Sequence, residues 1–536
     1  MKKITTLLFS ALLFVSASAQ NTFQKAFGSA GDETGTCIQH TLDGNYIISG
    51  YTNSFTAPFR DAYLIKTDTA GNLLWSNTYG GSGDEVCYYV TLVNTGGYVL
   101  TGGTSSFGAG GNDLYIIRTD AAGNLQWSAI AGGAYDDYGW SAVQTIDRGF
   151  LIAGFSQACL GGCLQGLLVK TDSSGAILWT KMLGGSGFET LYGIDRTGDG
   201  GYIVTGETST NSFGSSDTWL IKLNAVGDTL WTKFYGSANE ESGAVVRQTA
   251  DRGYIIAGDI HNAFNIHHAS LLKTDSMGNL QWAKTFGAPD TSGGGEFGWD
   301  VHQLADRGYM MLGSTPGFNN SMQVFIVRTD SMGNMLWSKT FGGSQPDDPW
   351  YSIQTADGGF AIAGATQSFG SGQWDIYLLK IDSLGSANWC NDSSIVPEAV
   401  TLVLQTGSGT IITTGMQTSN PLMVTNNPAT IAVNICPPVG AEEINFEGSD
   451  VLIYPNPFNT SATIRIYDFA PSTRGTIYDF VLYDILGREV LVSELRTPNS
   501  RLERGNLQSG MYFYKVTGDK GQGTRDIIGA GKIVIE

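Results

Sequence analysis

The chain has 536 residues, with 30 Lys and Arg against 49 Asp and Glu, which gives a formal net charge of -19. A hydrophobic share of 42% with only 15% charged residues excludes an intrinsically disordered chain, and the length is too great for one ordinary core. The acidic balance argues against nucleic acid or an anionic membrane as the partner, whereas 72 glycines are typical of a turn-rich all-β protein.

The first 19 residues have the pattern of a secretory signal peptide. Lys2 and Lys3 supply the positive charge, Leu7–Val15 the short apolar run, and residues 17–19 a cleavage site of small side chains. No later apolar run approaches the ~18 residues that are needed to cross a bilayer. We therefore expect a mature chain without a transmembrane segment that is exported through the periplasm.

An aromatic residue recurs at intervals of 51 to 55 residues along most of the chain. It lies on the last strand of each unit, and a unit has four strand-sized segments of alternating polarity, which are separated by turns rich in Asp, Asn and Gly. A period of this length with four strands per unit predicts the blades of a β-propeller over residues 20–436. The markers are Phe23, Trp75, Trp127, Trp179, Trp231, Trp282, Trp337 and Trp389.

The number of blades depends on the last part of the repeat region. Seven complete sets of strands lie between Phe23 and Trp389. Residues 400–416 repeat the first two strands once more, and residues 421–434 form a degenerate third. If these strands accept residues 22–27 as their fourth, the ring closes with eight blades, which we favour because closure removes an exposed edge. Seven blades is the alternative if residues 400–434 are only a spacer.

The repeats resemble the bacterial beta-propeller repeat of surface and secreted proteins. The segment Gly80-Gly81-Ser82-Gly83-Asp84, which follows a Trp strand, carries the likeness, and similar segments follow in most units. The resemblance extends from residue 22 to about residue 435, and it implies a fold rather than an activity.

Residues 437–449 break the period and are interpreted as a linker to a small β-sandwich at 450–536. This region resembles the type A C-terminal sorting domain of the type IX secretion system of Bacteroidetes-type bacteria. The resemblance implies an Ig-like sandwich, the type IX machinery as partner, and a secreted or outer-surface destination. The residues that carry it are Tyr454, Pro455, Asn456, Pro457, Asp484, Gly487, Gly510, Tyr512 and Lys532.

Six cysteines stand in an exported chain, where disulfides are permitted. Cys159 and Cys163 lie close in sequence and are the first candidate pair. Cys390 and Cys436 are the second, because together they would fasten the end of the repeat region. No zinc-type spacing of cysteines occurs.

Acidic residues with neighbouring aromatics recur before the first strand of most units, where a propeller places them around one mouth of its channel. They predict either a ring that binds calcium or a sugar, or carboxylates that hold backbone groups within each blade. The candidate binding residues are Asp84, Glu85, Asp136, Asp137, Trp140, Glu240, Glu241, Asp347, Asp348 and Trp350.

Three histidines, His261, His267 and His268, lie together in the fifth unit. Their spacing suits no familiar metal motif, so we interpret them as exposed loop residues and predict no metal site. No nucleophile, acid or base set stands out, so no catalytic residue is predicted.

The sequence thus favours a non-enzymatic binding or adhesion protein with a glycan or protein ligand at the cell surface. A secreted carbohydrate-active hydrolase with its site at the channel mouth is the alternative. No cofactor is expected, and calcium is the ion that an acidic ring would take.

Overall fold

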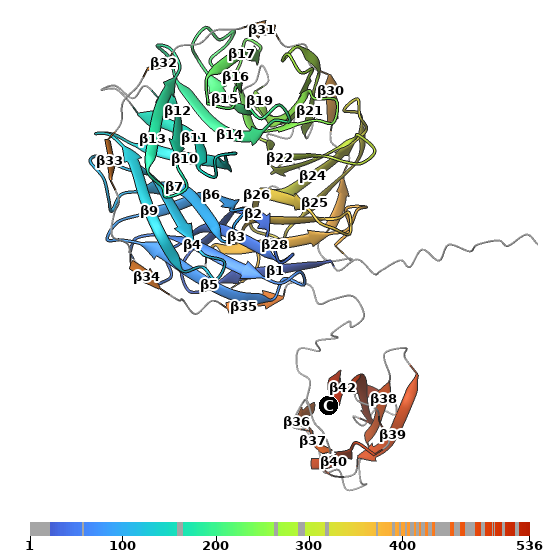
Figure 1. Ribbon diagram of the computed structural model, residues 1–536. Helices are drawn as coiled ribbons and strands as arrows, with labels where there is room; N and C mark the ends of the chain where they lie inside the picture. The colour runs from blue at the N-terminus through green and yellow to red at the C-terminus, as the bar shows by residue number, and fades with distance from the viewer. Residues whose placement is uncertain are drawn as a thin grey trace, which may run out of the picture. The chain divides into compact units, whose positions relative to one another are not determined.

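The computed structural model divides into two compact units, Met1–Cys436 and Pro437–Glu536, and each is described by itself (Figure 1). Among the described residues no helix is long and apolar enough to cross a membrane. The structure describes residues 22–55, 58–157, 164–261, 266–287, 295–316, 321–370, 373–387, 392–395, 398–401, 405–407, 412–413, 417–419, 424–426, 431–434, 451–454, 461–466, 478–483, 488–495, 497, 499–505, 507, 510–519 and 525–535.

The first unit is a β-propeller, as the period predicts, in which antiparallel blades of four strands are arranged in a ring (Figure 1). We number the blades in chain order. Blade 1 has β2 (Glu33–His40), β3 (Tyr46–Thr52), β4 (Asp61–Thr67) and β5 (Leu73–Gly80). Blade 2 has β6 (Glu85–Leu92), β7 (Tyr98–Thr104), β8 (Asp113–Thr119) and β9 (Leu125–Gly132). Blade 3 has β10 (Asp137–Gln144), β11 (Phe150–Gln157), β12 (Leu164–Thr171) and β13 (Ile177–Leu183). Blade 4 has β14 (Glu189–Arg196), β15 (Tyr202–Thr208), β16 (Asp217–Leu223) and β17 (Thr229–Gly236). Blade 5 has β18 (Glu241–Gln248), β19 (Tyr254–His261), β20 (His267–Thr274) and β21 (Leu280–Gly287). Blade 6 has β22 (Phe297–Gln303), β23 (Tyr309–Thr315), β24 (Gln323–Thr329) and β25 (Met335–Phe341). Blade 7 has β26 (Asp347–Gln354), β27 (Phe360–Thr366), β28 (Asp375–Ile381) and β1 (Phe23–Gly28).

The propeller has seven blades, so the preference for eight is wrong and the seven-bladed alternative is correct. The N-terminal strand β1 is the fourth strand of blade 7, where Lys25 pairs with Leu378 of β28. Because β1 completes the blade formed by β26, β27 and β28, the ring closes before residue 392 is reached. The N-terminal strand does close the ring, but it does so one blade earlier than the sequence suggests.

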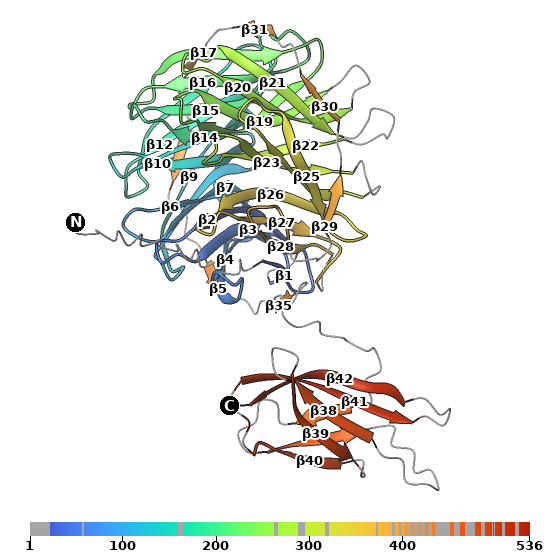
Figure 2. The ribbon, with the colours of Figure 1, turned by 90° about the vertical axis from the view of Figure 1, so that its right-hand side faces the viewer.

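Seven short strands described between residues 392 and 434 form no blade of their own and instead lie along the outer rim of the ring; we call them the belt (Figures 1 and 2). Each belt strand pairs antiparallel with the outermost strand of one blade, so it covers an edge that would otherwise offer unpaired backbone groups. The belt visits blades 6, 5, 4, 3, 2, 1 and 7 through β29 (Asp392–Ile395), β30 (Glu398–Thr401), β31 (Gln405–Gly407), β32 (Ile412–Thr413), β33 (Gln417–Ser419), β34 (Val424–Asn426) and β35 (Ile431–Asn434).

The recurring aromatic residues join neighbouring blades. Gly123 adopts a φ of 82° in a hairpin turn, and a Cβ there would lie 2.9 Å from the Trp75 ring of the preceding blade. The turn therefore needs glycine both for its backbone conformation and for its closeness to the indole. Gly71 lies in the same way against Phe23 of β1, so the contact continues across the closure of the ring. The marker aromatics thus repeat for a packing reason.

The second unit is a β-sandwich, as predicted. It has two sheets. One consists of β36 (Val451–Tyr454), β37 (Ser461–Ile466) and β40 (Asn499–Glu503), and the other of β39 (Glu489–Leu495), β38 (Tyr478–Tyr483), β41 (Gly510–Asp519) and β42 (Arg525–Ile535). Side chains from both sheets, including Ile464, Phe480, Val516 and Ile533, form one buried core. The short strand β40 was not foreseen.

Candidate functional site

The innermost strand of every blade carries a β-bulge at the same place. In β10, for example, the pairing register shifts between Gly139 and Ser141, which leaves Trp140 as the extra residue. A bulge turns its residue out of the regular alternation, and here the bulge residues of all seven blades line a single cavity of about 390 Å³. The bulge residues in chain order are Thr36, Tyr88, Trp140, Tyr192, Ala244, Trp299 and Trp350.

Five of the seven bulge residues are aromatic, and they form two arcs. In the first arc, Trp140 stacks on Tyr88 with ring centroids 4.2 Å apart and meets Tyr192 edge-on at 5.5 Å. In the second arc, Trp299 stacks between Phe297, at 5.7 Å, and Trp350, at 5.4 Å. Stacked and edge-on ring pairs of this kind hold the rings in fixed orientations, so each arc presents a preorganised apolar surface.

The small side chain of Ala244 interrupts the aromatic ring at blade 5, where the cavity wall is polar. Glu207 lies there, and its Oε1 accepts hydrogen bonds from Tyr192, at 2.8 Å, and Thr190, at 3.0 Å. Burial raises the pKa of Glu207 above its usual value, and the hydrogen bonds from Tyr192 and Thr190 oppose this shift. Five further acidic residues and histidines line the cavity: Glu240, Glu241, Asp259, His261 and His267.

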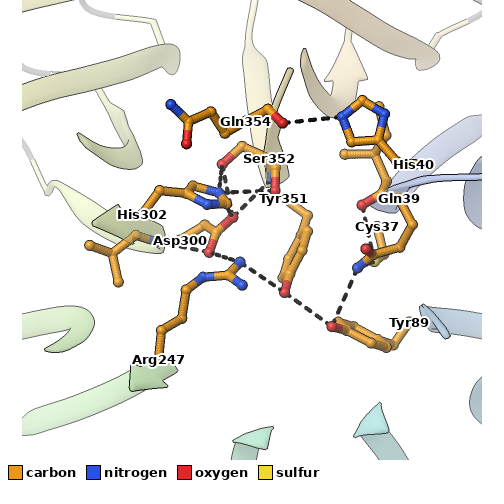
Figure 3. Close-up of polar contacts among 12 residues, drawn as sticks. Cys37, Gln39, His40, Tyr89, Arg247, Asp300, His302, Tyr351, Ser352 and Gln354 are labelled. Carbon is orange, nitrogen blue, oxygen red and sulfur yellow. Dashed lines mark hydrogen bonds and ion pairs between the residues drawn. The ribbon is translucent and has the colours of Figure 1, made fainter. Parts of the chain in front are cut away.

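Two tyrosines, Tyr89 and Tyr351, belong both to the cavity lining and to a buried polar network inside the channel (Figure 3). Their hydroxyl oxygens are 3.1 Å apart and their rings meet edge to face. Arg247 donates from Nη2 to the Tyr351 hydroxyl at 3.0 Å and to Oδ1 of Asp300 at 2.7 Å. The network therefore connects inner strands of blades 2, 5, 6 and 7.

Asp300 is the centre of this network and is fully buried. Its Oδ2 accepts a hydrogen bond from the Ser352 hydroxyl at 2.8 Å and lies 3.1 Å from Nε2 of His302. Burial raises the pKa of Asp300, but the positive charge of Arg247, the interaction with His302 and the hydrogen bonds with both side chains together outweigh burial and hold that pKa well below its usual value. A paired and hydrogen-bonded carboxylate of this kind makes a rigid interior beneath the aromatic arcs.

Four of the predicted acidic residues occupy the first position of an inner strand, where each accepts a backbone N–H from the residue four positions earlier. The N–H of Gly81 donates to Glu85 at 2.7 Å, and Thr104 donates to the other oxygen of the same carboxylate at 2.6 Å. This geometry supports the alternative that the repeated acids hold their own blades. The other three have the corresponding backbone contact: Asp137 with Gly133, Glu241 with Ser237 and Asp347 with Gly343.

The remaining predicted residues are divided between scaffold and cavity. Asp84 and Asp136 accept backbone N–H groups of the preceding loop, from Arg60 at 2.9 Å and Asn112 at 2.7 Å. Asp348 has a hydrogen bond with Ser314, and burial raises its pKa to about 7. Of the ten predicted residues, the structure brings Trp140, Glu240, Glu241 and Trp350 together around the cavity. A binding role for them remains a prediction.

The sequence reasoning missed Trp299, Glu207 and Asp259 as lining residues. A usable signal was present for the first of them, because the bulge residue follows the first-position acid by three residues in every blade. Glu296 and Trp299 obey this spacing, as do Asp137 and Trp140. Glu207 and Asp259 lie on second strands, and only strand pairing brings them to the cavity.

The interpretation of the histidines as exposed loop residues is wrong. His261 ends β19 and is 7% exposed, and His267 and His268 begin β20. His261 and His267 line the cavity, and Nδ1 of His268 lies 3.4 Å from Oε2 of Glu296. The sequence misled because the connection between β19 and β20 has only five residues, whereas the corresponding connection between β3 and β4 has eight, so the strands of blade 5 extend over the histidines.

The cysteine and sorting-motif predictions fall largely on residues outside the described part of the chain. This applies to all four disulfide candidates, Cys159, Cys163, Cys390 and Cys436, and to Pro455, Asn456, Pro457, Asp484 and Gly487. Tyr454 ends β36, Gly510 begins β41, Tyr512 is buried on β41, and Lys532 lies on β42. Cys37 and Cys87, which are described, are buried free thiols.

Comparisons with known proteins identify the second unit. Residues 452–530 match the family model of the secretion system C-terminal sorting domain. A search of curated proteins found no significant match. The solved structure of PorZ, reported as an essential bacterial surface component of the type-IX secretion system of Porphyromonas gingivalis, aligns at 10% identity with a TM-score of 0.36, over 95% of this chain and 75% of that one.

The extracellular domain of BT4673, a putative one-component system of B. thetaiotaomicron, aligns at 8% identity with a TM-score of 0.19, over 95% of this chain and 99% of that one. Both TM-scores are too low for either likeness to carry an argument. The family match is independent of them and agrees with the motif order and the sandwich of the second unit. The chain is therefore an all-β repeat protein that ends in a type IX secretion system C-terminal sorting domain.

Proposed function

We propose that the propeller is a non-enzymatic binding protein of the cell exterior, with a carbohydrate ligand in the cavity lined by the bulge residues. The observation that carries this proposal is the placement of five aromatic rings, by one repeated bulge, around a cavity of about 390 Å³. That volume lies within the range of ligand pockets, and such pockets combine apolar walls with a few oriented polar groups.

The chemistry of the wall suits a sugar. The apolar face of a pyranose ring stacks on an aromatic ring, and Trp140 and Trp299 offer rings held by their neighbours. Sugar hydroxyls donate hydrogen bonds, and the carboxyl groups of Glu207 and Glu240 line the polar side of the cavity as acceptors. A strongly anionic glycan is disfavoured, because the chain carries a net charge of -19.

The bonding of the acidic side chains favours binding over hydrolysis. A glycosidase needs one carboxyl group as acid and a second as nucleophile or base, facing each other across the bond to be cleaved. Here Glu207 is held by Tyr192 and Thr190, and Asp259 by His267 and Ser242. The carboxyl groups of the first-position acids are engaged with their own blades.

A glycan panel tests the proposal. The purified mature chain is expected to retain one class of neutral glycan without releasing new reducing ends. Trp140→Ala and Trp299→Ala should each weaken retention at least about 10-fold, since each removes a stacking surface worth about 1.4 kcal/mol or more. Phe59→Ala is the matched control, because Phe59 is 44% exposed and does not line the cavity.

Two outcomes would overturn the proposal. Release of reducing ends by the wild-type chain would establish the hydrolase alternative. Equal retention by Trp140→Ala, Trp299→Ala and Phe59→Ala would place the ligand elsewhere.

We further propose that the sorting domain takes the propeller across the outer membrane, to the surface or the medium. The match at residues 452–530 supports this destination. Removing residues 451–536 should leave the propeller folded inside the cell envelope, because the two units have separate cores. Fractionation of producing cells checks this, and normal appearance of the truncated chain outside the cell would contradict it.

A further inference from the structure

Blade 5 departs from the repeat at the point where its wall borders the cavity. Its bulge residue is Ala244, where five other blades have an aromatic ring. In β19, Ile260 replaces the Thr or Ser whose equivalents Thr52, Thr104 and Thr366 donate to the first-position acid of their blades. Scaffold residues repeat from blade to blade, whereas a functional site needs one blade to differ.

Strand pairing in this blade brings three metal-ligating side chains to one face. His261 lies directly opposite His267 in the antiparallel register of β19 and β20. Asp259 precedes His261 by two residues in β19 and therefore projects from the same face of the sheet. All three residues line the cavity.

The three ligand atoms are already close together. Nδ1 of His267 is 2.8 Å from Nε2 of His261 and 2.8 Å from Oδ2 of Asp259, and the His261 and Asp259 atoms are 3.8 Å apart. Around a tetrahedral zinc ion with bonds of about 2.0–2.1 Å, ligand atoms are separated by roughly 3.3 Å. Shifts of about half an ångström would therefore seat an ion.

Neighbouring groups orient two of these ligands. Oε2 of Glu240 lies 3.4 Å from Nδ1 of His261, so the opposite ring nitrogen is directed at the cluster. Ser242 donates a hydrogen bond to Oδ1 of Asp259, which leaves Oδ2 for the cluster. Carboxylates and hydroxyls that fix the far side of a ligand in this way are a regular feature of metal sites.

The arrangement belongs to blade 5 alone. Among the described residues, these are the only three His, Cys, Asp or Glu side chains whose ligand atoms gather this closely. At the position of Asp259, the register of the other blades places Tyr51, Gly103, Phe155, Glu207, Ser314 and Ala365. At the position of His261, two residues further on, they carry Asn53, Ser105, Gln157, Ser209, Pro316 and Gln367.

We propose that Asp259, His261 and His267 form a binding site for a divalent transition-metal ion of the zinc class. Two imidazole nitrogens and one carboxylate oxygen suit zinc and its neighbours, whereas calcium and magnesium take oxygen ligands. Three protein ligands leave at least one coordination position, which faces the cavity. The site does not rest on carbohydrate binding, because the ion can be measured alone.

The test uses zinc and cobalt ions with the purified, chelator-treated mature chain. One zinc ion per chain is expected to bind and to raise the thermal midpoint. A cobalt-loaded chain should have the visible spectrum of a four- or five-coordinate nitrogen and oxygen site. His267→Gln and Asp259→Asn should each weaken zinc binding at least about 10-fold.

His40→Gln is the matched control, because His40 is a half-buried histidine of blade 1 that bonds the carbonyl of Gln354 outside the cluster. It should bind zinc as the wild type does. Unfolding midpoints measured in chelator establish that the variants are folded, and both substituted side chains are close in size to the originals. If zinc fails to bind stoichiometrically, if it binds equally to His267→Gln and Asp259→Asn, or if cobalt gives an intense thiolate band, the proposal is wrong.

Discussion

Tyr88 of blade 2 and Trp140 of blade 3 stack across the boundary between their blades, with ring centroids 4.2 Å apart and ring planes 16° from parallel. Both are bulge residues at the same position of successive inner strands. The stack therefore serves two purposes: it joins two blades, and it fixes the surface that we propose for ligand binding.

A double-mutant cycle should measure this stack. Tyr88→Ala and Trp140→Ala are each expected to lower the unfolding midpoint, and the double variant should lose less than the sum of the two. The coupling should be about 0.5–1.5 kcal/mol, the range for aromatic pairs. Denaturant unfolding followed by circular dichroism checks it. Strict additivity would mean that the two rings do not interact in solution.

A second cycle concerns Arg247 and Asp300. Arg247→Met and Asp300→Asn are each expected to destabilise the propeller by about 3–5 kcal/mol, because each leaves the partner's polar or charged group buried without its ion pair. The double variant should recover part of the loss, because neither charge then remains in the interior. Urea unfolding of the four proteins provides the measurement, and a double variant that loses the full sum would contradict this account.

Asp348 should make stability depend on pH. Burial raises its pKa to about 7 in the folded chain, above the ordinary value of 3.8, so the folded state binds this proton more tightly than the unfolded state does. Stability from this group is therefore lost as the pH rises from about 4 to about 7. Asp348→Asn should gain up to about 4 kcal/mol over the wild type at pH 8 and little at pH 4.

Thermal unfolding across this pH range gives the comparison, with Asp330→Asn as a control of opposite sign. Asp330 is an exposed turn carboxyl whose pKa is lowered, with hydrogen bonds from Asn334 and Met332 outweighing a raising effect of burial. That variant should be less stable than the wild type at neutral pH and should approach it in acid. If the Asp348→Asn difference does not change with pH, the carboxyl is not buried as described.

Loss of β1 should expose blade 7. Ala26 pairs with Tyr377 on one side and with Val433 on the other, so removing residues 20–28 leaves two strand edges open. We expect aggregation of the shortened chain. Ala26→Pro, which removes one backbone N–H from a central strand, should destabilise in the same direction. Light scattering and unfolding midpoints check both variants, and a shortened chain of wild-type stability would contradict the closure of the ring by β1.

Calcium should leave the thermal midpoint of the propeller unchanged. The first-position acids already accept backbone and hydroxyl hydrogen bonds in their blades, as Glu85 does from Gly81 and Thr104. A specific site filled at 100 times its dissociation constant would add about 2.7 kcal/mol, which a melting curve resolves readily. Comparison of calcium with chelator decides the matter, and a raised midpoint would restore the acidic-ring hypothesis.

The periodic features of the fold could be predicted from the sequence because the same residue pattern occurs in every repeat. Trp75 and its equivalents predicted the strands and turns of the blades, and ordered motifs predicted the sandwich. The blade number was wrong because residues 400–416 have the alternation of two blade strands. Alternation predicts a strand but does not say which edge it joins, and the belt strands are only two to four residues long.

The site was harder to predict because it depends on departures from the repeat and on pairing between strands. Asp259 and His267 are eight residues apart in sequence, and only the register of β19 with β20 brings them together. The bulges, by contrast, can be recognised in the sequence, because most bulge residues are aromatic and lie three positions after an acidic residue. Ala244 departs from this pattern in blade 5, where the cavity wall is polar.

The belt determines the order in which strand pairings break when the propeller is pulled from its C-terminal side. Its last strand, β35, holds the first strand of the chain, and the links before it pass from blade 1 back to blade 6. A pull applied to the chain beyond residue 434 therefore acts first on the pairing between β35 and β1. Because each link is a separate short pairing, we expect it to peel away one link at a time while the four-stranded blades stay whole. Tension on a tethered C-terminus would therefore break the pairings of the belt strands one after another before it disturbed the aromatic arcs.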